Sequence, residues 1–111
     1  MVRTAQMMID DKEYTLAYTP GCLQCIEDLG YSGIDDMLSD ERYQIRNIIY
    51  IIEAMIKCGA YQDKKRGKEP RTISVEELRM TLSAEELNEA AEILGKLQNA
   101  KPDVEADVPK N

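Results

Sequence analysis

Three cysteines, Cys22, Cys25 and Cys58, are the side chains in this sequence whose type and spacing could support chemistry. Cys22 and Cys25 form a Cys-x-x-Cys pair near the start of a predicted helix, where the helix dipole lowers a thiol pKa. Redox pairs of this kind normally follow a strand in a β–α–β unit, which the neighbouring sequence does not predict. A zinc site needs four ligands, so Cys58 and a carboxylate or a second chain would have to complete one. We therefore favour a packing role for the thiols over a metal or redox role.

The remaining side chains offer little equipment for catalysis. The chain has 21 Asp and Glu, 14 Lys and Arg, and no His, so the usual acid–base group near neutral pH is missing. Acidic pairs at 76–77 and 85–86 fall in predicted first helical turns, where they offset the helix dipole. The sequence contains no phosphate-binding loop, nucleophile elbow or dinucleotide fingerprint. We expect a protein that is not an enzyme and uses no cofactor.

Charge and hydropathy also bear on the partners. A net charge of −7 works against binding to nucleic acid or to a membrane surface. The basic run at residues 64–71 contains no aromatic residue on which a base could stack. No N-terminal run resembles a signal peptide, and no segment approaches the roughly 20 apolar residues of a membrane span. We therefore expect a cytoplasmic protein with reduced cysteines and no nucleic-acid or membrane partner.

Local patterns predict a hairpin followed by helices. Tyr14, Leu16 and Tyr18 alternate with smaller residues, which predicts a β-hairpin over residues 5–18. Thr19 and Pro20 then supply an N-cap and a first helical residue. That helix ends at Gly30, and a turn with a helical fragment, residues 31–41, follows it.

A long apolar helix is predicted from Glu41 to Cys58, with Gly59 ending it and a mobile polar connector over residues 60–72. Its predicted core face consists of Ile45, Ile48, Ile49, Ile52, Met55 and Ile56.

Two capping boxes, Ser74 with Glu77 and Ser83 with Glu86, predict the starts of the last two helices. Residues 101–111 contain two prolines and several acidic residues, which predicts a disordered tail. The fold class expected for residues 1–100 is a mostly α (α+β) domain, with the N-terminal hairpin packed on a small bundle of four to five helices.

The opening segment resembles a known family. Phage and prophage tail assembly chaperones often begin with I-(D/N)-G-K-E-Y-x-L and continue into a short helix that ends near L-G. An Ile-rich helix and an acidic C-terminal helix follow both there and here. Asp11 replaces the glycine usual in that family, and the cysteine pair is not part of the pattern. The residues that match are Ile9, Asp10, Lys12, Glu13, Tyr14, Leu16, Glu27, Leu29 and Gly30.

The resemblance implies a small, non-catalytic protein of the bacterial host cytoplasm that acts during virion assembly. Members of that family bind the tape measure protein and help to recruit tail tube subunits around it. An apolar groove could shield a tape measure helix, and the candidate groove residues here are Tyr14, Tyr18, Ile48, Ile52 and Met55. The same side chains could instead fill the core of the domain.

Two alternatives stay open at this stage. One is a head–tail connector or tail completion protein, which would remain in the particle as a ring and would make self-association part of its function. The other is a small thiol- or zinc-dependent regulator that uses Cys22, Cys25 and Cys58.

Overall fold

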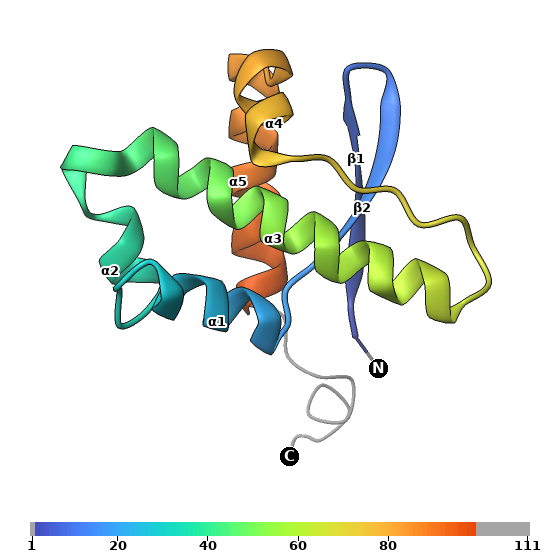
Figure 1. The fold of residues 1–111 in the computed structure, drawn as a ribbon, viewed down its shortest axis with the longest axis horizontal. Coiled ribbons are helices and arrows are strands. Elements are labelled where there is room, and N and C mark those ends of the chain that lie inside the picture. The colour runs from blue at the N-terminus through green and yellow to red at the C-terminus, as the bar shows by residue number, and fades with distance from the viewer. Residues whose placement is uncertain (1, 100–111) are drawn as a thin grey trace.

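A computed structural model describes residues 2–99 of the chain. A β-hairpin precedes the helices, as predicted, and the expected class of a hairpin packed on four to five helices is confirmed (Figure 1). The predicted tail at 101–111 lies outside the described residues. The elements are β1 (Thr4–Ile9), β2 (Lys12–Ala17), α1 (Pro20–Asp28), α2 (Ile34–Leu38), the short 3₁₀ helix η1 (Glu41–Tyr43), α3 (Gln44–Lys65), α4 (Val75–Thr81) and α5 (Ala84–Asn99).

The hairpin closes through a two-residue turn at Asp10 and Asp11. Ile9 pairs with Lys12 across the antiparallel strands, and the φ angles of Asp10 and Asp11 are 53° and 66°. Two successive positive φ angles are the signature of a type I′ turn, whose twist matches that of the strands. The backbone N–H of Asp10 also donates to Glu86 Oε2 at 3.3 Å, so the turn contacts the start of α5.

The central helix, α3, packs against both β2 and α1. The prediction that it ends at Gly59 is wrong, because the helix continues to Lys65 and only Arg66 begins the connector. Gly59 is instead the point of closest approach to β2. A Cβ atom placed on Gly59 would lie 1.8 Å from the carbonyl oxygen of Thr15. The glycine is therefore required by helix–strand contact rather than by helix termination.

A buried polar bond lies next to this contact. Thr15 Oγ1 donates to Asp63 Oδ2 at 2.7 Å and is 3.0 Å from Gln6 Oε1. Both Thr15 and Asp63 are buried. The last turn of α3, assigned from the sequence to a mobile connector, is thus tied to the hairpin.

The core lies between α3, the hairpin and the remaining helices. The predicted core residue Ile45 is an exception, since 61% of its surface is exposed. Ile45 lies in the first turn of α3, where it borders a small hollow beside Val75 and Arg79 of α4 instead of being covered. Large side chains with almost no exposed surface are Met7, Ile9, Leu16, Ile26, Met37, Ile51, Ile52, Met55, Ile56 and Leu78.

The helix ends follow the predicted capping residues. Thr19 Oγ1 accepts from the backbone N–H of Gly21, and Ser83 Oγ accepts from that of Glu86 while Glu86 Oε1 accepts from the N–H of Ser83. Ser74 Oγ likewise accepts from the N–H of Glu77. Gly30 has a φ of 94°, and Tyr31 N bonds to Ile26 O as in a Schellman motif.

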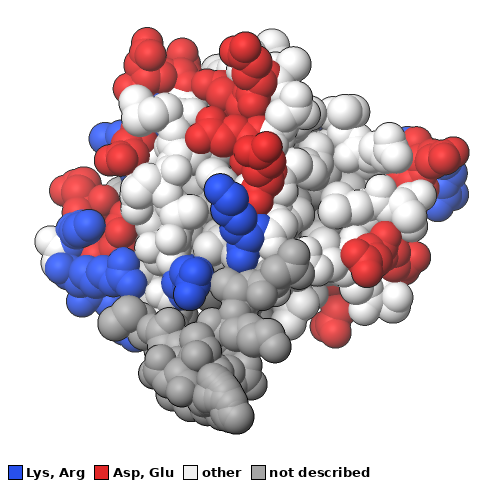
Figure 2. Space-filling view, turned by 180° about the vertical axis from the view of Figure 1, so that it is seen from behind, with Lys and Arg blue, Asp and Glu red and all other residues white. Residues whose placement is uncertain are grey.

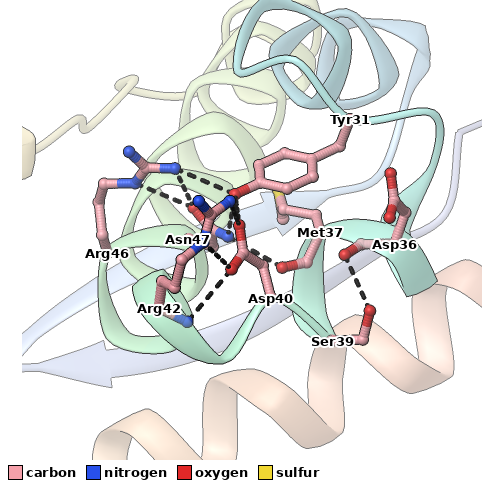
Figure 3. A network of polar contacts seen from close by, with 8 residues as sticks. All are labelled: Tyr31, Asp36, Met37, Ser39, Asp40, Arg42, Arg46 and Asn47. Carbon is pink, nitrogen blue, oxygen red and sulfur yellow. Dashed lines mark hydrogen bonds and ion pairs between the residues drawn. The ribbon is translucent and has the colours of Figure 1, made fainter.

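A polar network fixes the passage from α2 to α3 (Figure 3). The fully buried Asn47 donates from Nδ2 to Met37 O at 2.9 Å and to the Tyr31 hydroxyl at 3.1 Å. The Tyr31 hydroxyl in turn donates to Asp40 Oδ2. Arg42 Nε completes the chain of contacts at 3.0 Å from Asp40 Oδ1. Every one of these groups has a structural partner, so the network positions α3 and is not a free polar site.

Candidate helix-binding groove and thiol cluster

A mainly apolar opening lies between α1 and α3. It has a volume of about 420 Å³. Each helix contributes positions spaced by three and four residues, which form one face of a helix. A groove with two such sides can receive the side chains of a third helix. We call it the α1–α3 groove, and its lining is Gly21, Gln24, Cys25 and Asp28 of α1, Leu29 just after it, and Tyr50, Glu53, Ala54, Lys57 and Cys58 of α3.

The groove adjoins a second hollow further along α3. This hollow has a volume of about 390 Å³ and shares Lys57 and Cys58 with the groove. Tyr61 lies in it and is largely exposed. Along α3 the two openings extend from Tyr50 to Gln62, about 18 Å at the helical rise of 1.5 Å per residue.

Charged side chains border the groove. Asp28 and Glu53 line it, and Lys57 Nζ lies 3.0 Å from Glu53 Oε2 in an ion pair along α3. The basic side chain of the groove, Lys57, is thus already paired with Glu53. A ligand that entered the groove would meet the carboxylates of Asp28 and Glu53, and positive charge on the ligand would suit that edge.

The back face of the molecule carries charged side chains of both signs (Figure 2). Acidic side chains gather at the top of this view, over the hairpin turn and the starts of α4 and α5. Basic side chains gather on the left, where α3 ends and the connector begins, and in the middle. No broad surface of positive charge appears on this face in the described residues.

The five predicted partner-binding residues do not line these openings in the described structure. Ile52 and Met55 have no exposed surface and Tyr14 has 5%, so these three side chains belong to the core. Tyr18 and Ile48 are half-buried against that core. A domain of this size uses most of its large apolar side chains to fill its interior, which explains their placement. The signal that the sequence did offer for the groove is the apolar character of α3 beyond its main face, at Tyr50 and Ala54.

The closest pair of thiols in residues 2–99 is not the Cys-x-x-Cys pair. Cys22 Sγ and Cys58 Sγ are 3.8 Å apart, which joins α1 to α3 across 36 positions of sequence. Cys22 is fully buried, whereas Cys58 is half-buried and borders both openings. Cys25 lies along the groove with its sulfur 4.0 Å from Tyr50 O. The sequence could not reveal this pair, because only the packing of the two helices creates it.

Hydrogen bonds to Cys58 favour its thiolate form. Thr19 Oγ1 is 2.9 Å from Cys58 Sγ and already accepts from the N–H of Gly21, so its own proton is free to point at the sulfur. The bond from Cys22, followed by the bond from Thr19, lowers the pKa of Cys58 to about 6. The same bond and burial raise the pKa of Cys22, whereas burial and the nearby Glu53 raise the pKa of Cys25.

The described residues do not assemble a metal site. Within residues 2–99, no three Cys, Asp or Glu side chains are grouped so that they could hold a metal ion. A zinc-dependent regulator would therefore need ligands from elsewhere. In the same part of the chain, no helix has both the length and the apolar character needed to cross a membrane.

Comparison with known proteins gives no match to a family model, to a curated protein or to a solved structure. The functional assignment therefore depends on the groove and on the hairpin motif.

Proposed function

We propose that this protein is a non-catalytic binding protein that holds an apolar helix of another protein in the α1–α3 groove. In this proposal it acts in the bacterial cytoplasm as a phage or prophage tail assembly chaperone. Its ligand is a helical segment of a tape measure protein, and tail tube subunits are recruited around that complex.

The observation that carries the proposal is the form of the groove. Its lining on α1 and on α3 repeats at intervals of three and four residues, and together with the adjoining hollow it extends over about 18 Å of α3. A partner helix that presents apolar side chains at the same intervals would bury them between Gln24 on one side and Tyr50 and Ala54 on the other. A tape measure helix exposes such a stripe until the tube covers it.

The family resemblance supports the same surface. Its matching residues end with Glu27, Leu29 and Gly30, which lie at the end of α1, and Leu29 lines the groove. The first part of the motif forms the hairpin turn and β2. Of the residues that match the family, Leu29 is therefore the one that lies in the lining of the proposed binding site.

The edge of the groove indicates the charge of the ligand. Asp28 and Glu53 face a helix laid along it, and Lys57 is engaged by Glu53. We expect the bound helix to carry Lys or Arg beside its apolar stripe, so that its positive charges lie next to these carboxylates.

The test uses variants that fill or truncate the groove at positions open to solvent or only half-buried. Gln24→Arg puts a long charged side chain into the groove, and Tyr50→Ala removes its largest side chain. The matched control is Met80→Arg on α4, where 86% of the side chain is exposed and lies outside the groove lining. Each is co-expressed with a candidate tape measure protein, and the affinity for a purified helical segment of that protein is measured by calorimetry.

We expect both groove variants to bind at least about tenfold more weakly, which corresponds to about 1.4 kcal/mol, and Met80→Arg to bind like the parent protein. Failure of the parent protein to retain either the tape measure or the tube protein would reject the chaperone assignment. Loss of binding only in Met80→Arg would indicate that the binding site lies on α4 and not in the groove. A stable ring of subunits in sedimentation, without either partner, would support the connector alternative instead.

A further inference from the structure

We propose that Cys22 and Cys58 form a thiol–disulfide exchange site. In it, Cys58 attacks a low-molecular-weight disulfide such as glutathione disulfide, and Cys22 then closes a disulfide bond between α1 and α3. This site follows from the placement of the two thiols and does not depend on the proposed binding of a helix.

The geometry brings the two sulfurs close to bonding distance. They are 3.8 Å apart and must approach to about 2.0 Å in a disulfide. The first turn of α1 lies directly against Cys58, since a Cβ atom on Gly21 would be 3.2 Å from its sulfur. A small shift of side chains or of the first turn of α1 is therefore enough to join them.

The surroundings distinguish the roles of the two thiols. Cys58 borders both openings, so a disulfide in solution can reach its sulfur. Cys22 has no exposed surface and lies behind Cys58, which suits a resolving thiol rather than an attacking one. Thr19 Oγ1 and Cys22 Sγ both lie within hydrogen-bonding distance of Cys58 Sγ, and donors at these positions stabilise a thiolate.

The exchange proceeds in two balanced steps. The Cys58 thiolate attacks one sulfur of glutathione disulfide, a mixed disulfide forms on Cys58, and one glutathione thiolate leaves. The sulfur of Cys22 then attacks the Cys58 sulfur as the Cys22 proton passes to the departing glutathione sulfur, which leaves as the second glutathione thiol. The protein loses two electrons and glutathione disulfide gains them, so one disulfide is exchanged for another.

Charged groups near Cys58 also influence its reactivity. Lys57, Glu53 and Asp28 line the groove that Cys58 borders, and Lys57 is paired with Glu53. One positive and two negative groups leave an excess of negative charge, which disfavours a thiolate, so we expect the contacts with Thr19 and Cys22 to be what lowers the pKa of Cys58.

The first experiment needs no substitution. The full-length protein is alkylated with iodoacetamide between pH 5 and 9, and modification of each cysteine is followed by peptide mass spectrometry. At pH 6.5 we expect Cys58 to react about five- to tenfold faster than an ordinary thiol, after allowing for the weaker nucleophilicity of a low-pKa thiolate. Its rate should reach a plateau at a lower pH than the rate of an ordinary thiol, because its pKa is lowered. Cys25 should react more slowly at pH 6.5, because its pKa is raised, and its rate should still be rising at pH 9. Equal rates for Cys58 and Cys25 at pH 6.5 would overturn the proposal.

The second experiment identifies the bond. The parent protein is treated with glutathione disulfide at pH 7, and the products are mapped without reduction. We expect a Cys22–Cys58 disulfide in the parent protein and in the matched control Cys25→Ser. The Cys22→Ser variant should accumulate the mixed glutathione disulfide on Cys58, and Cys58→Ser should lose the rapid reaction.

Two results would contradict this outcome. One is a Cys22–Cys25 or Cys25–Cys58 disulfide as the main product in the parent protein. The other is an unchanged rate of reaction in Cys58→Ser. The alkylation experiment uses only the parent protein. It can therefore still refute the proposal if a variant fails to fold.

Discussion

At the scale of single residues, Gly59 and Asp40 show two different ways in which one position controls this fold. Gly59 allows α3 to meet the backbone of β2, because even a methyl group there would collide with Thr15 O. Asp40 acts through hydrogen bonds, since it accepts from both Arg42 and Tyr31 at the turn before α3. Gly59 is required because it has no side chain, whereas Asp40 acts through its charged carboxylate.

Gly59→Ala should destabilise the protein severely. The new Cβ would overlap a backbone carbonyl, which cannot move aside as a flexible side chain could, so we expect a loss of about 3 kcal/mol or more in the free energy of unfolding. Urea titration followed by circular dichroism measures it. The matched control is Gly95→Ala in α5, where an added Cβ meets no atom within 4 Å. There we expect a gain of about 0.5–1 kcal/mol from helix propensity. An equal effect at both glycines would contradict the close approach.

The Asp40 contacts predict a dependence of stability on acid. Hydrogen bonds from Arg42 and then from Tyr31 hold the pKa of Asp40 well below its usual range. A carboxyl group with a lower pKa in the folded state stabilises the fold above its ordinary pKa of about 3.9, and this contribution is lost as the pH falls below that value. We expect the urea midpoint to fall between pH 5 and pH 2 more steeply in the parent protein than in Asp40→Asn. Parallel curves for the two proteins would show that Asp40 contributes nothing.

At the scale of elements, the hairpin turn is the clearest place to improve the fold. Asp10 and Asp11 both have positive φ, a conformation that glycine adopts at lower cost than other residues. Asp11→Gly restores the residue found in the chaperone motif and should raise the free energy of unfolding by about 0.5–1 kcal/mol. Thermal and urea unfolding measure the change. A loss of stability would indicate that the Asp11 side chain has a role beyond the turn.

The helix starts could be predicted from the sequence, whereas the end of α3 could not. Capping residues act within a few positions of the helix end that they determine, so Thr19, Ser74 and Ser83 marked helix starts correctly. The sequence predicts a helix end at Gly59 because the strand residue that requires this glycine, Thr15, is 44 positions away in the sequence and comes close only in the folded structure.

The site was harder to predict than the fold. The apolar pattern of α3 identified Ile52 and Met55, but a pattern on one helix cannot tell a core face from a groove face. The groove and the Cys22–Cys58 pair exist only where α1 and α3 come together, so their residues follow from tertiary packing.

At the scale of the whole molecule, α3 is the element against which the hairpin, α1, α2 and α4 pack. The α1–α3 groove and the thiol pair both depend on the position of α1 relative to this helix (Figure 1). A covalent link between Cys22 and Cys58 would therefore hold two neighbouring elements of the fold in their native relation.

Oxidation of this pair should stabilise the protein against unfolding. A disulfide that closes a loop of this length typically adds about 2–4 kcal/mol by restricting the unfolded chain. We expect the urea midpoint to rise after treatment with glutathione disulfide and to return after reduction with dithiothreitol. Cys25→Ser should behave in the same way, whereas Cys58→Ser should not respond. A fall in the midpoint on oxidation would show that the disulfide strains the contact between α1 and α3.

The bond between Thr15 and Asp63 has a consequence for β1. A hydroxyl group has one proton, which cannot serve both Asp63 Oδ2 at 2.7 Å and Gln6 Oε1 at 3.0 Å. The shorter contact, to the carboxylate, takes that proton. The amide of Gln6 must then rotate so that its nitrogen donates to the Thr15 oxygen. The Asp63 carboxylate on α3 thereby determines the orientation of the Gln6 amide on β1, because both groups contact the Thr15 hydroxyl.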